Sequence, residues 1–349
     1  MSQMLEKILT YWIQKKASDI HIAQGSPVTF RIKKKMSTLS ESWDISKESI
    51  ERVLLALMNW DQTRVDEFLE TKDADFAYIF SDGTSFRVNA YMKIGKIAFA
   101  LRRIEAEPLA MEALWLPEWV KKFIHMKQGL ILITWPTGSG KSTSMVSILN
   151  EINKNRSEHI LTVEDPIEFV FKNDKSMFSQ REVGNDTDSF TAALRAAMRE
   201  DPDVIMIGEM RDRETVEAAM EMAETGHLVI STMHTSGSVQ TLTRIINFFP
   251  PEIQNAVRYK LGDVLGWVLS QRLVQKSDGT GIVGIYELMF MTTGIKNLIR
   301  EWTLNQIKWN IETGMKDGMI TMLRHAQQLE EQGIIDKEGY QDFFPDDME

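Results

Sequence analysis

The chain has 349 residues, with 40 basic and 50 acidic side chains, a formal net charge of −10 and no cysteine. This length predicts two domains with sizeable cores, and the lack of thiols excludes disulfides and thiolate zinc sites. The acidic balance disfavours a general nucleic-acid binder. The longest apolar run, residues 129–134, is too short to cross a bilayer, and the N-terminus lacks the apolar segment of a signal peptide.

Residues 1–105 are predicted to form a small α+β domain. Its predicted strands are residues 18–22, 29–33, 75–80 and 85–91. Its predicted helices are residues 4–16 and 50–69. Residues 102–111 contain Pro108 and alternating charge, so this segment is the predicted linker to the second domain.

From about residue 112 onward, short apolar strands alternate with amphipathic helices. The predicted strands are residues 130–134, 160–164, 204–208 and 228–233, and the clearest helices between them are residues 190–199 and 213–225. This alternation predicts a parallel sheet covered by helices. Such sheets bind ligands at the carboxyl ends of their strands. The remainder, residues 253–349, is predicted to be mostly helical.

A phosphate-binding loop is the strongest local signal in the chain. Residues 135–143 read WPTGSGKST and match the P-loop pattern except at the first glycine, where Trp135 stands. Backbone N–H groups and a helix N-terminus would cradle the phosphates of a nucleoside triphosphate. Lys141 would reach the β- and γ-phosphates, and the Ser142 hydroxyl would hold Mg²⁺. The residues expected to bind nucleotide here are Pro136, Thr137, Gly138, Ser139, Gly140, Lys141, Ser142 and Thr143.

Polar side chains follow the next three predicted strands. Glu164 ends the second strand, and Glu209 follows the third in the Walker B form. His227 begins the fourth strand and His234 ends it. A water that attacks a γ-phosphate needs an oriented carboxylate, and Mg²⁺ needs direct or water-mediated anionic ligands. Glu164 and Glu209 are therefore expected to divide these two tasks.

A set of motifs extends over nearly the whole chain. They are SDIH (18–21), FRVNA (86–90), the phosphate loop (135–143), EDPIE (164–168), GEMRD (208–212), AETGHL (223–228), TMHT (232–235), SQRL (270–273) and GIKNLIRE (294–301). Together they resemble the secretion ATPases of the type II/type IV pilus superfamily, and specifically the PilT-type twitching-motility retraction ATPases. The last motif resembles the AIRNLIRE segment typical of the retraction branch.

The resemblance implies a fold and a set of cofactors. It implies an α/β chain with an N-terminal PAS-like α+β domain at residues 1–105. A RecA-like P-loop ATPase domain with a helical C-terminal part would follow at residues 106–349. The family hydrolyses ATP with Mg²⁺ as a homohexamer, so ATP, Mg²⁺ and further copies of this chain are the implied cofactors and partners.

The resemblance also implies residue roles in the second domain. Glu164 would be the general base or water positioner, and Glu209 would act on Mg²⁺ through water. His234 would sense the γ-phosphate. His227 either joins it there or caps the fourth strand, and both readings stay open.

Two arginines of the first domain, Arg87 and Arg103, match the region where this family supplies arginine fingers across a domain or subunit boundary. Such a cation stabilises transition-state charge and is worth roughly 10³–10⁵ in rate in GTPases. The alternative for Arg87 is a surface position on a strand.

The implied partner is an inner-membrane platform protein at the base of a type IV pilus, on which the hexamer would act to drive pilus retraction. The chain would be cytoplasmic and peripheral at the inner membrane, with no stable nucleic-acid partner. Assembly and type II secretion relatives carry a longer N-terminal region and a four-cysteine zinc element. This chain shows neither feature, which favours the retraction type. The alternatives are such an assembly or secretion ATPase, and an accessory nucleotide-binding subunit without turnover.

Four of the nine tryptophans stand where the family pattern has glycine: Trp115, Trp135, Trp267 and Trp302. Where glycine adopts positive φ, a side chain costs roughly 1–2 kcal/mol. We interpret these residues as glycines whose UGA codons were read as tryptophan, which happens when a gene that uses UGA for glycine is translated with another code. The alternative is real divergence, in which the first loop position accepts a bulky residue.

Overall fold

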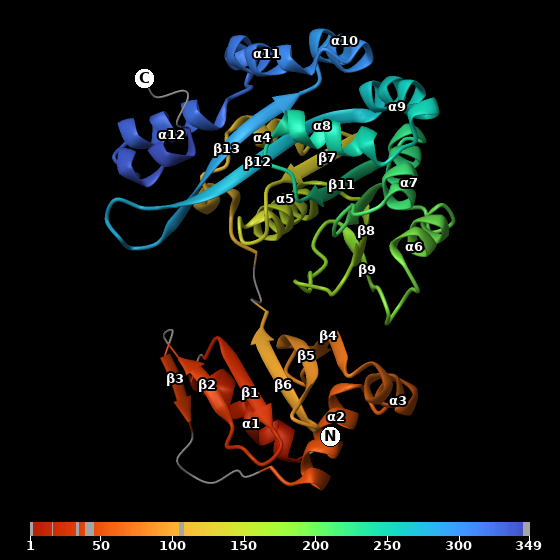
Figure 1. Ribbon diagram of the computed structural model, residues 1–349, viewed down its shortest axis with the longest axis vertical. Coiled ribbons are helices and arrows are strands. Elements are labelled where there is room, and N and C mark those ends of the chain that lie inside the picture. Colours follow the sequence, from red (N-terminus) through yellow and green to blue (C-terminus); the bar gives the residue numbers. More distant parts are fainter. Residues whose placement is uncertain (1–2, 16, 33–34, 39–44, 105–107, 345–349) are drawn as a thin grey trace. The chain divides into compact units, whose positions relative to one another are not determined.

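The computed structural model describes residues 3–15, 17–32, 35–38, 45–104 and 108–344. The chain divides into two compact units (Figure 1). Unit 1 comprises Met1–Glu107 and Asp165–Val170, and unit 2 comprises Pro108–Glu164 and Phe171–Glu349. Among the described helices, none combines the length and the apolar character needed to cross a bilayer.

Unit 1 contains an antiparallel sheet with the strand order β3-β2-β1-β6-β5-β4. Its strands are β1 (Asp19–Ala23), β2 (Thr29–Ile32), β3 (Lys35–Thr38), β4 (Asp73–Ile79), β5 (Ser85–Lys93) and β6 (Lys96–Arg103). Its helices are α1 (Gln3–Lys15), α2 (Lys47–Leu57) and α3 (Gln62–Thr71). Trp12 of α1 is fully buried, and its ring centroid lies 4.6 Å from that of Phe86 on β5.

Two predictions for unit 1 are corrected by the structure. The segment 50–69, expected as one helix, forms α2 and α3 with a break at Asn59 and Trp60, whose φ angles are 55° and 65°. Left-handed backbone at consecutive residues cannot continue a right-handed helix, so the chain turns there. The expected linker 102–111 overlaps β6, which runs to Arg103 and pairs with both β1 and β5.

Unit 2 is built on a sheet with the order β13-β12-β7-β11-β10-β8-β9. Its strands are β7 (Gly129–Thr134), β8 (His159–Glu164), β9 (Met177–Glu182), β10 (Val204–Ile207), β11 (Leu228–Met233), β12 (Leu265–Gln275) and β13 (Ile282–Phe290). All neighbours pair in parallel except β12 and β13, which are antiparallel. Every residue of β7 and β11 is buried, as expected for parallel strands covered on both faces.

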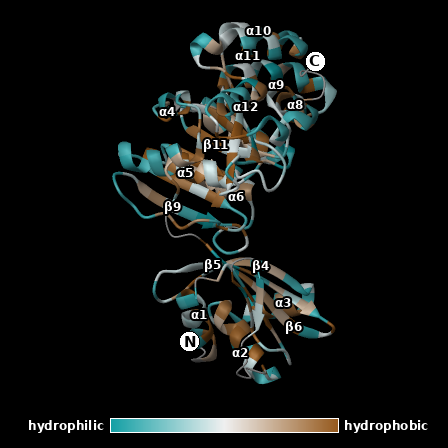
Figure 2. Ribbon diagram, turned by 90° about the vertical axis from the view of Figure 1, so that its left-hand side faces the viewer, coloured by the Kyte–Doolittle hydropathy of each residue, from teal (hydrophilic) through white to brown (hydrophobic). Residues whose placement is uncertain are grey.

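Helices surround this sheet. The α-helices are α4 (Trp119–Phe123), α5 (Lys141–Asn155), α6 (Phe190–Ala197), α7 (Arg213–Glu224), α8 (Ser238–Asn247), α9 (Pro251–Val264), α10 (Thr293–Glu301), α11 (Ile307–Thr313) and α12 (Met322–Glu331). Short 3₁₀ segments are η1 (Met111–Leu114), η2 (Leu304–Gln306), η3 (Gly314–Asp317), η4 (Lys337–Gly339) and η5 (Gln341–Phe343). Leu130 and Leu132 of β7 share a core with α6, α7, α8 and α9. Figure 2 shows hydrophobic residues gathered around β11, inside this layer of helices.

The prediction of a mostly helical C-terminal part is wrong for residues 265–290. These residues form the long strands β12 and β13, which extend the sheet on the far side of β7. Most of β12 is buried, so its sequence lacks the alternation that marks a half-exposed strand. Strand β9 is a further element without a clear sequence signal, because its pattern is polar and only partly buried.

Candidate functional site

Four adjacent strands of unit 2 bring their carboxyl ends to one edge of the sheet. Thr134 at the end of β7 pairs with Met233 of β11, and Ile207 of β10 pairs with Ser231 of β11 and with Val163 of β8. The phosphate loop, His234, Glu209 and Glu164 follow or end these strands. The structure therefore assembles most of the predicted second-domain site residues at the edge where parallel sheets bind ligands.

The phosphate loop runs from β7 into α5. Gly138 and Gly140 have φ angles of 83° and 81°, which glycine adopts without steric cost, and Gly140 is the N-cap of α5. Lys141 is buried, and its Nζ donates to the carbonyl oxygens of Trp135 at 2.5 Å and Pro136 at 3.2 Å. The ammonium group is thus folded back over the loop, at the place where loop amides and the helix N-terminus can receive phosphate.

Glu209 contacts the loop after β11 and, through His234 in that loop, is connected to the phosphate loop. Its Oε2 lies 3.2 Å from His234 Nε2, and its Oε1 forms an ion pair with Arg211. The other ring nitrogen, His234 Nδ1, lies 3.3 Å from Thr137 Oγ1 in the phosphate loop. A continuous polar chain therefore runs from the phosphate loop through the histidine to the Walker B carboxylate.

Glu164 is a buried carboxylate that accepts hydrogen bonds from Thr162 and Gln180. Thr162 Oγ1 donates to Glu164 Oε1 at 2.7 Å, and Gln180 Nε2 of β9 donates to the same oxygen at 3.2 Å. A carboxylate fixed from two neighbouring strands is suited to orienting a water molecule, because its position does not have to be organised during the reaction.

The structure places the remaining predicted residues elsewhere. His227 precedes β11 at the opposite end of the strand from His234, and its Nδ1 lies 2.9 Å from the Met222 carbonyl oxygen and 3.2 Å from Thr225 Oγ1. These contacts fit the capping alternative, and the described part of unit 2 does not bring His227 to the phosphate loop.

Arg87 and Arg103 belong to unit 1. Arg87 lies on β5, and its Nη1 is 3.5 Å from Glu168 Oε1 in the same unit. Arg103 ends β6, opposite Phe86 of β5. Both side chains are partly exposed, and their role in catalysis stays a prediction.

Hard oxygen ligands suit Mg²⁺, which in phosphate-binding enzymes is bound by one or two protein groups together with phosphate oxygens and water. Ser142 is the second residue of α5 and partly exposed, and the Glu209 carboxylate lies at the same edge of the sheet. Among the described residues there is no cluster of three or more His, Asp or Glu side chains that would hold a metal by itself. The donor set therefore fits Mg²⁺ bound together with a nucleotide.

Strand β12, which was not predicted from the sequence, supports the loop from the other side. Ser270 Oγ of β12 lies 2.8 Å from Thr134 Oγ1, and Gln271 Nε2 donates to the Ser139 carbonyl oxygen at 2.5 Å. The SQRL motif was the available signal that residues 270–273 are functionally important. It belongs to the set of family motifs, although the resemblance assigns it no role.

Three of the four tryptophans at family glycine positions have left-handed backbone or another positive φ. The φ angles are 58° at Trp115, 148° at Trp135 and 60° at Trp302. Trp267 is fully buried in β12 beside a register shift between Leu265 and Trp267, and it is not among the residues with positive φ. The backbone therefore fits glycine at three positions and is neutral at the fourth, while Trp60, which lies at no family glycine position, has a positive φ of 65° as well.

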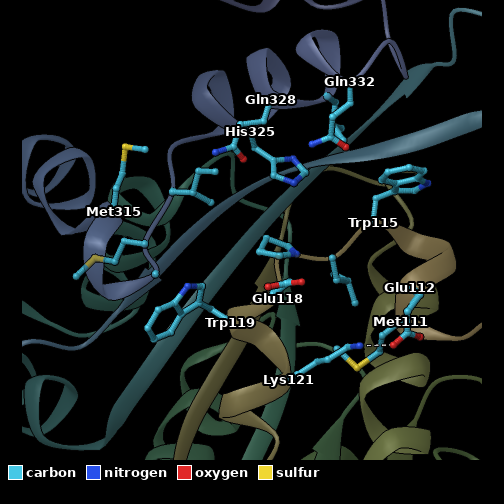
Figure 3. Close-up of a pocket in the computed structure, with 16 residues that line it drawn as sticks. Met111, Glu112, Trp115, Glu118, Trp119, Lys121, Met315, His325, Gln328 and Gln332 are labelled. Carbon is cyan, nitrogen blue, oxygen red and sulfur yellow. Dashed lines mark hydrogen bonds and ion pairs between the residues drawn. The ribbon is translucent and has the colours of Figure 1, made fainter.

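A cavity of about 490 Å³ lies between the segment 111–121 and the C-terminal segment 315–332 of unit 2. Figure 3 shows Trp115 and Trp119 on two sides of it, with Glu118 between them and His325 facing in from the C-terminal segment. The backbone N–H of Tyr286 donates to His325 Nδ1 at 3.3 Å, and burial lowers the pKa of His325 to about 4. None of the predicted nucleotide-site residues lines this cavity.

Comparison with known proteins identifies the family of this site. The family model described as type II/IV secretion system protein matches residues 1–281. The chain belongs to this family. The type IV pilus retraction ATPase PilT of Pseudomonas aeruginosa is 39% identical over 337 residues, which cover 96% of each chain. The twitching motility protein of Neisseria gonorrhoeae is 40% identical over 296 residues, covering 85% of this chain and 79% of the relative.

A solved structure agrees with these relatives. The crystal structure of the pilus retraction motor PilT with bound ADP has a TM-score of 0.89 and 42% identity to this chain, and covers 98% of this chain and 97% of its own. The resemblance to the retraction ATPases, the α/β fold class and the RecA-like ATPase domain are thereby confirmed. This member of the secretion ATPase family is an ATPase.

Proposed function

We propose that this chain is the Mg²⁺-dependent ATPase that powers retraction of a type IV pilus. The observation that carries the proposal is the polar chain Thr137–His234–Glu209, which links the phosphate loop to the Walker B strand beside the buried Glu164. A nucleotide-binding protein without turnover has no chemical need for both carboxylates. The kinship with PilT proteins supports the pilus as the place of action.

ATP would bind with its phosphates on the amides of the loop and the N-terminus of α5. The Nζ group of Lys141 donates to loop carbonyl oxygens in the structure. When ATP binds, it would donate to β- and γ-phosphate oxygens in their place. Ser142 and Glu209 would hold Mg²⁺, the latter through water. When bound, the metal neutralises charge on the phosphate oxygens and fixes their orientation.

Hydrolysis would depend on three side chains at the same edge. Glu164 would orient the attacking water and receive its proton. His234 would contact the γ-phosphate and report its loss to Glu209 and Thr137, because its two ring nitrogens already lie near both groups. The same contacts would break and reform in each cycle, which gives hydrolysis a mechanical consequence in three loops.

The assembly would be a homohexamer acting on an inner-membrane platform protein, peripheral to the cytoplasmic face of the membrane. Arg87 and Arg103 would complete the site across a domain or subunit boundary and supply positive charge to the transition state. The two arginines lie on adjacent strands of one sheet, but the register pairs Arg87 with Arg102 and Arg103 with Phe86, so they stand on opposite faces of that sheet.

The enzymatic part is tested by steady-state Mg-ATP hydrolysis and by ADP binding. The chain, Trp135→Gly and Glu164→Gln are compared, with Glu209→Ala as the blank. We expect the Trp135→Gly form to hydrolyse ATP. Glu164→Gln should lower the rate of ATP hydrolysis by about 10²–10⁴-fold and keep the affinity for ADP. If every form binds ADP and none hydrolyses ATP, the chain is an accessory subunit and the motor proposal fails.

The direction of force is tested by deleting the gene in its native bacterium. Loss of a disassembly motor leaves pili on the cell surface without twitching movement, whereas loss of an assembly motor leaves no pili. Electron microscopy of the deletion strain separates these outcomes. A bald strain would contradict retraction and favour the assembly alternative.

A further inference from the structure

Strand β12 contacts the phosphate loop through residues far away in the sequence. Gln271 is 132 residues from Ser139, and its Nε2 donates to the Ser139 carbonyl oxygen at 2.5 Å. The adjacent Ser270 contacts Thr134 at the end of β7, which fixes the register of the two strands at this point. Gln271 is only 1% exposed and Ser139 is 5% exposed, so water does not compete for this bond.

The amide of Gln271 can face the loop in one orientation only. The Ser139 carbonyl oxygen is an acceptor, so the NH₂ end of the amide must point toward it. Among the described residues, Gln271 Oε1 has no hydrogen-bond partner, which leaves the bond to Ser139 as the polar contact that holds the side chain.

The bond determines the direction of a peptide plane in the loop. In a trans peptide the carbonyl oxygen and the N–H of the next residue point in opposite directions. Because Gln271 binds the Ser139 carbonyl oxygen on the β12 side, the Gly140 N–H points away from β12. That N–H is one of the donors with which a phosphate loop surrounds its anion.

Gly140 makes room for this contact. A Cβ atom at Gly140 would lie 3.1 Å from Gln271 Nε2 and 3.7 Å from the Leu273 methyl groups, and the φ of Gly140 is 81°. The glycine is therefore required twice, for the left-handed backbone and for the close approach of β12. The second requirement exists only because Gln271 and Leu273 pack against the loop.

The geometry points to Gln271 as a positioning residue of the ATPase site. It holds the peptide between Ser139 and Gly140 so that the Gly140 N–H faces the phosphates of the bound nucleotide. Gln271 touches no reacting atom; it acts through the main chain of the loop. This inference rests on the proposed nucleotide site, and it assigns a function to the SQRL motif.

Substitution with glutamate tests the inference, because it replaces the amide donor by a group of the same shape that titrates. In the Gln271→Glu variant, a protonated carboxyl group can donate to the Ser139 carbonyl oxygen, whereas an ionised one repels it. We expect this variant to lower kcat/KM about 10²-fold at pH 8, as loss of one preorganised donor does. The loss relative to the unsubstituted chain should shrink as the pH falls to 6.

Two comparisons separate positioning from general damage to the fold. Gln271→Met has no donor and no titrating group, so its loss should not change with pH. Gln254 donates to the Phe249 carbonyl oxygen at 2.9 Å, away from the loop, and Gln254→Glu should leave nucleotide affinity and turnover unchanged. Equal losses in Gln271→Glu and Gln271→Met at every pH would overturn the inference, as would wild-type turnover in Gln271→Met.

ADP affinity, measured by titration calorimetry, keeps the inference separate from the proposed turnover. If the unsubstituted chain binds ADP without hydrolysing ATP, the motor proposal fails, but the inference on Gln271 can still be tested by ADP binding. The ADP affinity of Gln271→Glu, divided by that of the unsubstituted chain, must then be about tenfold lower at pH 8 than at pH 6. If Gln271→Glu does not fold, Gln271→Met must lose ADP affinity while Gln254→Met keeps it. Unchanged ADP affinity in Gln271→Met overturns the inference in either case.

Discussion

The end of α10 offers a direct test of the tryptophans in left-handed backbone. The Thr303 N–H donates to the Leu298 carbonyl oxygen at 2.9 Å, and the Trp302 N–H donates to the Ile299 carbonyl oxygen at 3.3 Å. This pair of bonds is a Schellman motif with Trp302 at the position that glycine usually occupies. The φ of 60° at Trp302 places its Cβ where an L-residue is strained.

Comparing glycine with alanine isolates this strain. Trp302→Gly and Trp302→Ala both remove the indole, and with it the cation–π contact in which the Arg258 guanidinium lies 4.3 Å from the ring centroid. The two variants differ from each other only by the Cβ atom. We expect the glycine form to have the higher free energy of unfolding, by about 1–2 kcal/mol. Trp309 is the control, because it is 64% exposed within α11 of the same unit. There alanine should be the more stable, by roughly 0.5–1 kcal/mol.

The assay is denaturant unfolding of the four full-length variants, followed by far-ultraviolet circular dichroism. The prediction is a reversal of sign between the two positions, with a total difference of about 2 kcal/mol. An alanine form at 302 as stable as the glycine form would refute the left-handed helix end. It would also remove the physical argument that this tryptophan stands in place of a glycine.

Two further predictions concern stability in unit 2. The pKa of His325 is about 4 in the folded chain and 6.5 in the unfolded chain, so the unfolded state binds the proton first as the pH falls. The free energy of unfolding should therefore decrease by up to about 3 kcal/mol as the pH drops from 6.5 to 4. His325→Asn, which keeps an acceptor for the Tyr286 N–H, should abolish that part of the slope in pH-dependent denaturant titrations; an unchanged slope would contradict it. Arg156 is almost buried and donates to the carbonyl oxygens of Ile124 at 2.8 Å and Met126 at 2.7 Å and to Glu158 at 3.0 Å. Arg156→Lys should lower the free energy of unfolding by about 2 kcal/mol, because an ammonium group cannot reproduce these hydrogen bonds of the guanidinium group. Arg324 forms an exposed ion pair, so Arg324→Lys should change the denaturant midpoint of unfolding little. Equal effects of the two substitutions would contradict this prediction.

The part of the site that could be predicted is the part written in contiguous sequence. The phosphate loop is a local pattern between a strand and a helix, so its residues are recognisable without a fold. Glu164, Glu209 and His234 could be added because parallel strands present their carboxyl ends at one edge. The register of β7, β11, β10 and β8 agrees with that rule.

The part that escaped prediction depends on distant segments. Residues 265–275 have an apolar run that fits a buried strand or a buried helix, and only pairing with β7 and β13 decides between them. The bond from Gln271 to Ser139 follows from that pairing, and the SQRL motif that contains Gln271 does not by itself indicate which residue it contacts. Similarly, the break between α2 and α3 lies at two left-handed residues, Asn59 and Trp60, that helical periodicity does not reveal.

Positive φ at tryptophan also bears on what the natural chain is. Local preference agrees with the fold at the other glycines of the site, such as Gly138 and Gly140, whose positive φ angles need no side chain. Local preference and fold conflict at Trp60, Trp115, Trp135 and Trp302, and the last three stand where the motif resemblance implies glycine. Misread glycine codons would explain these positions with a single cause, and a glycine at position 135 would complete the phosphate-loop pattern.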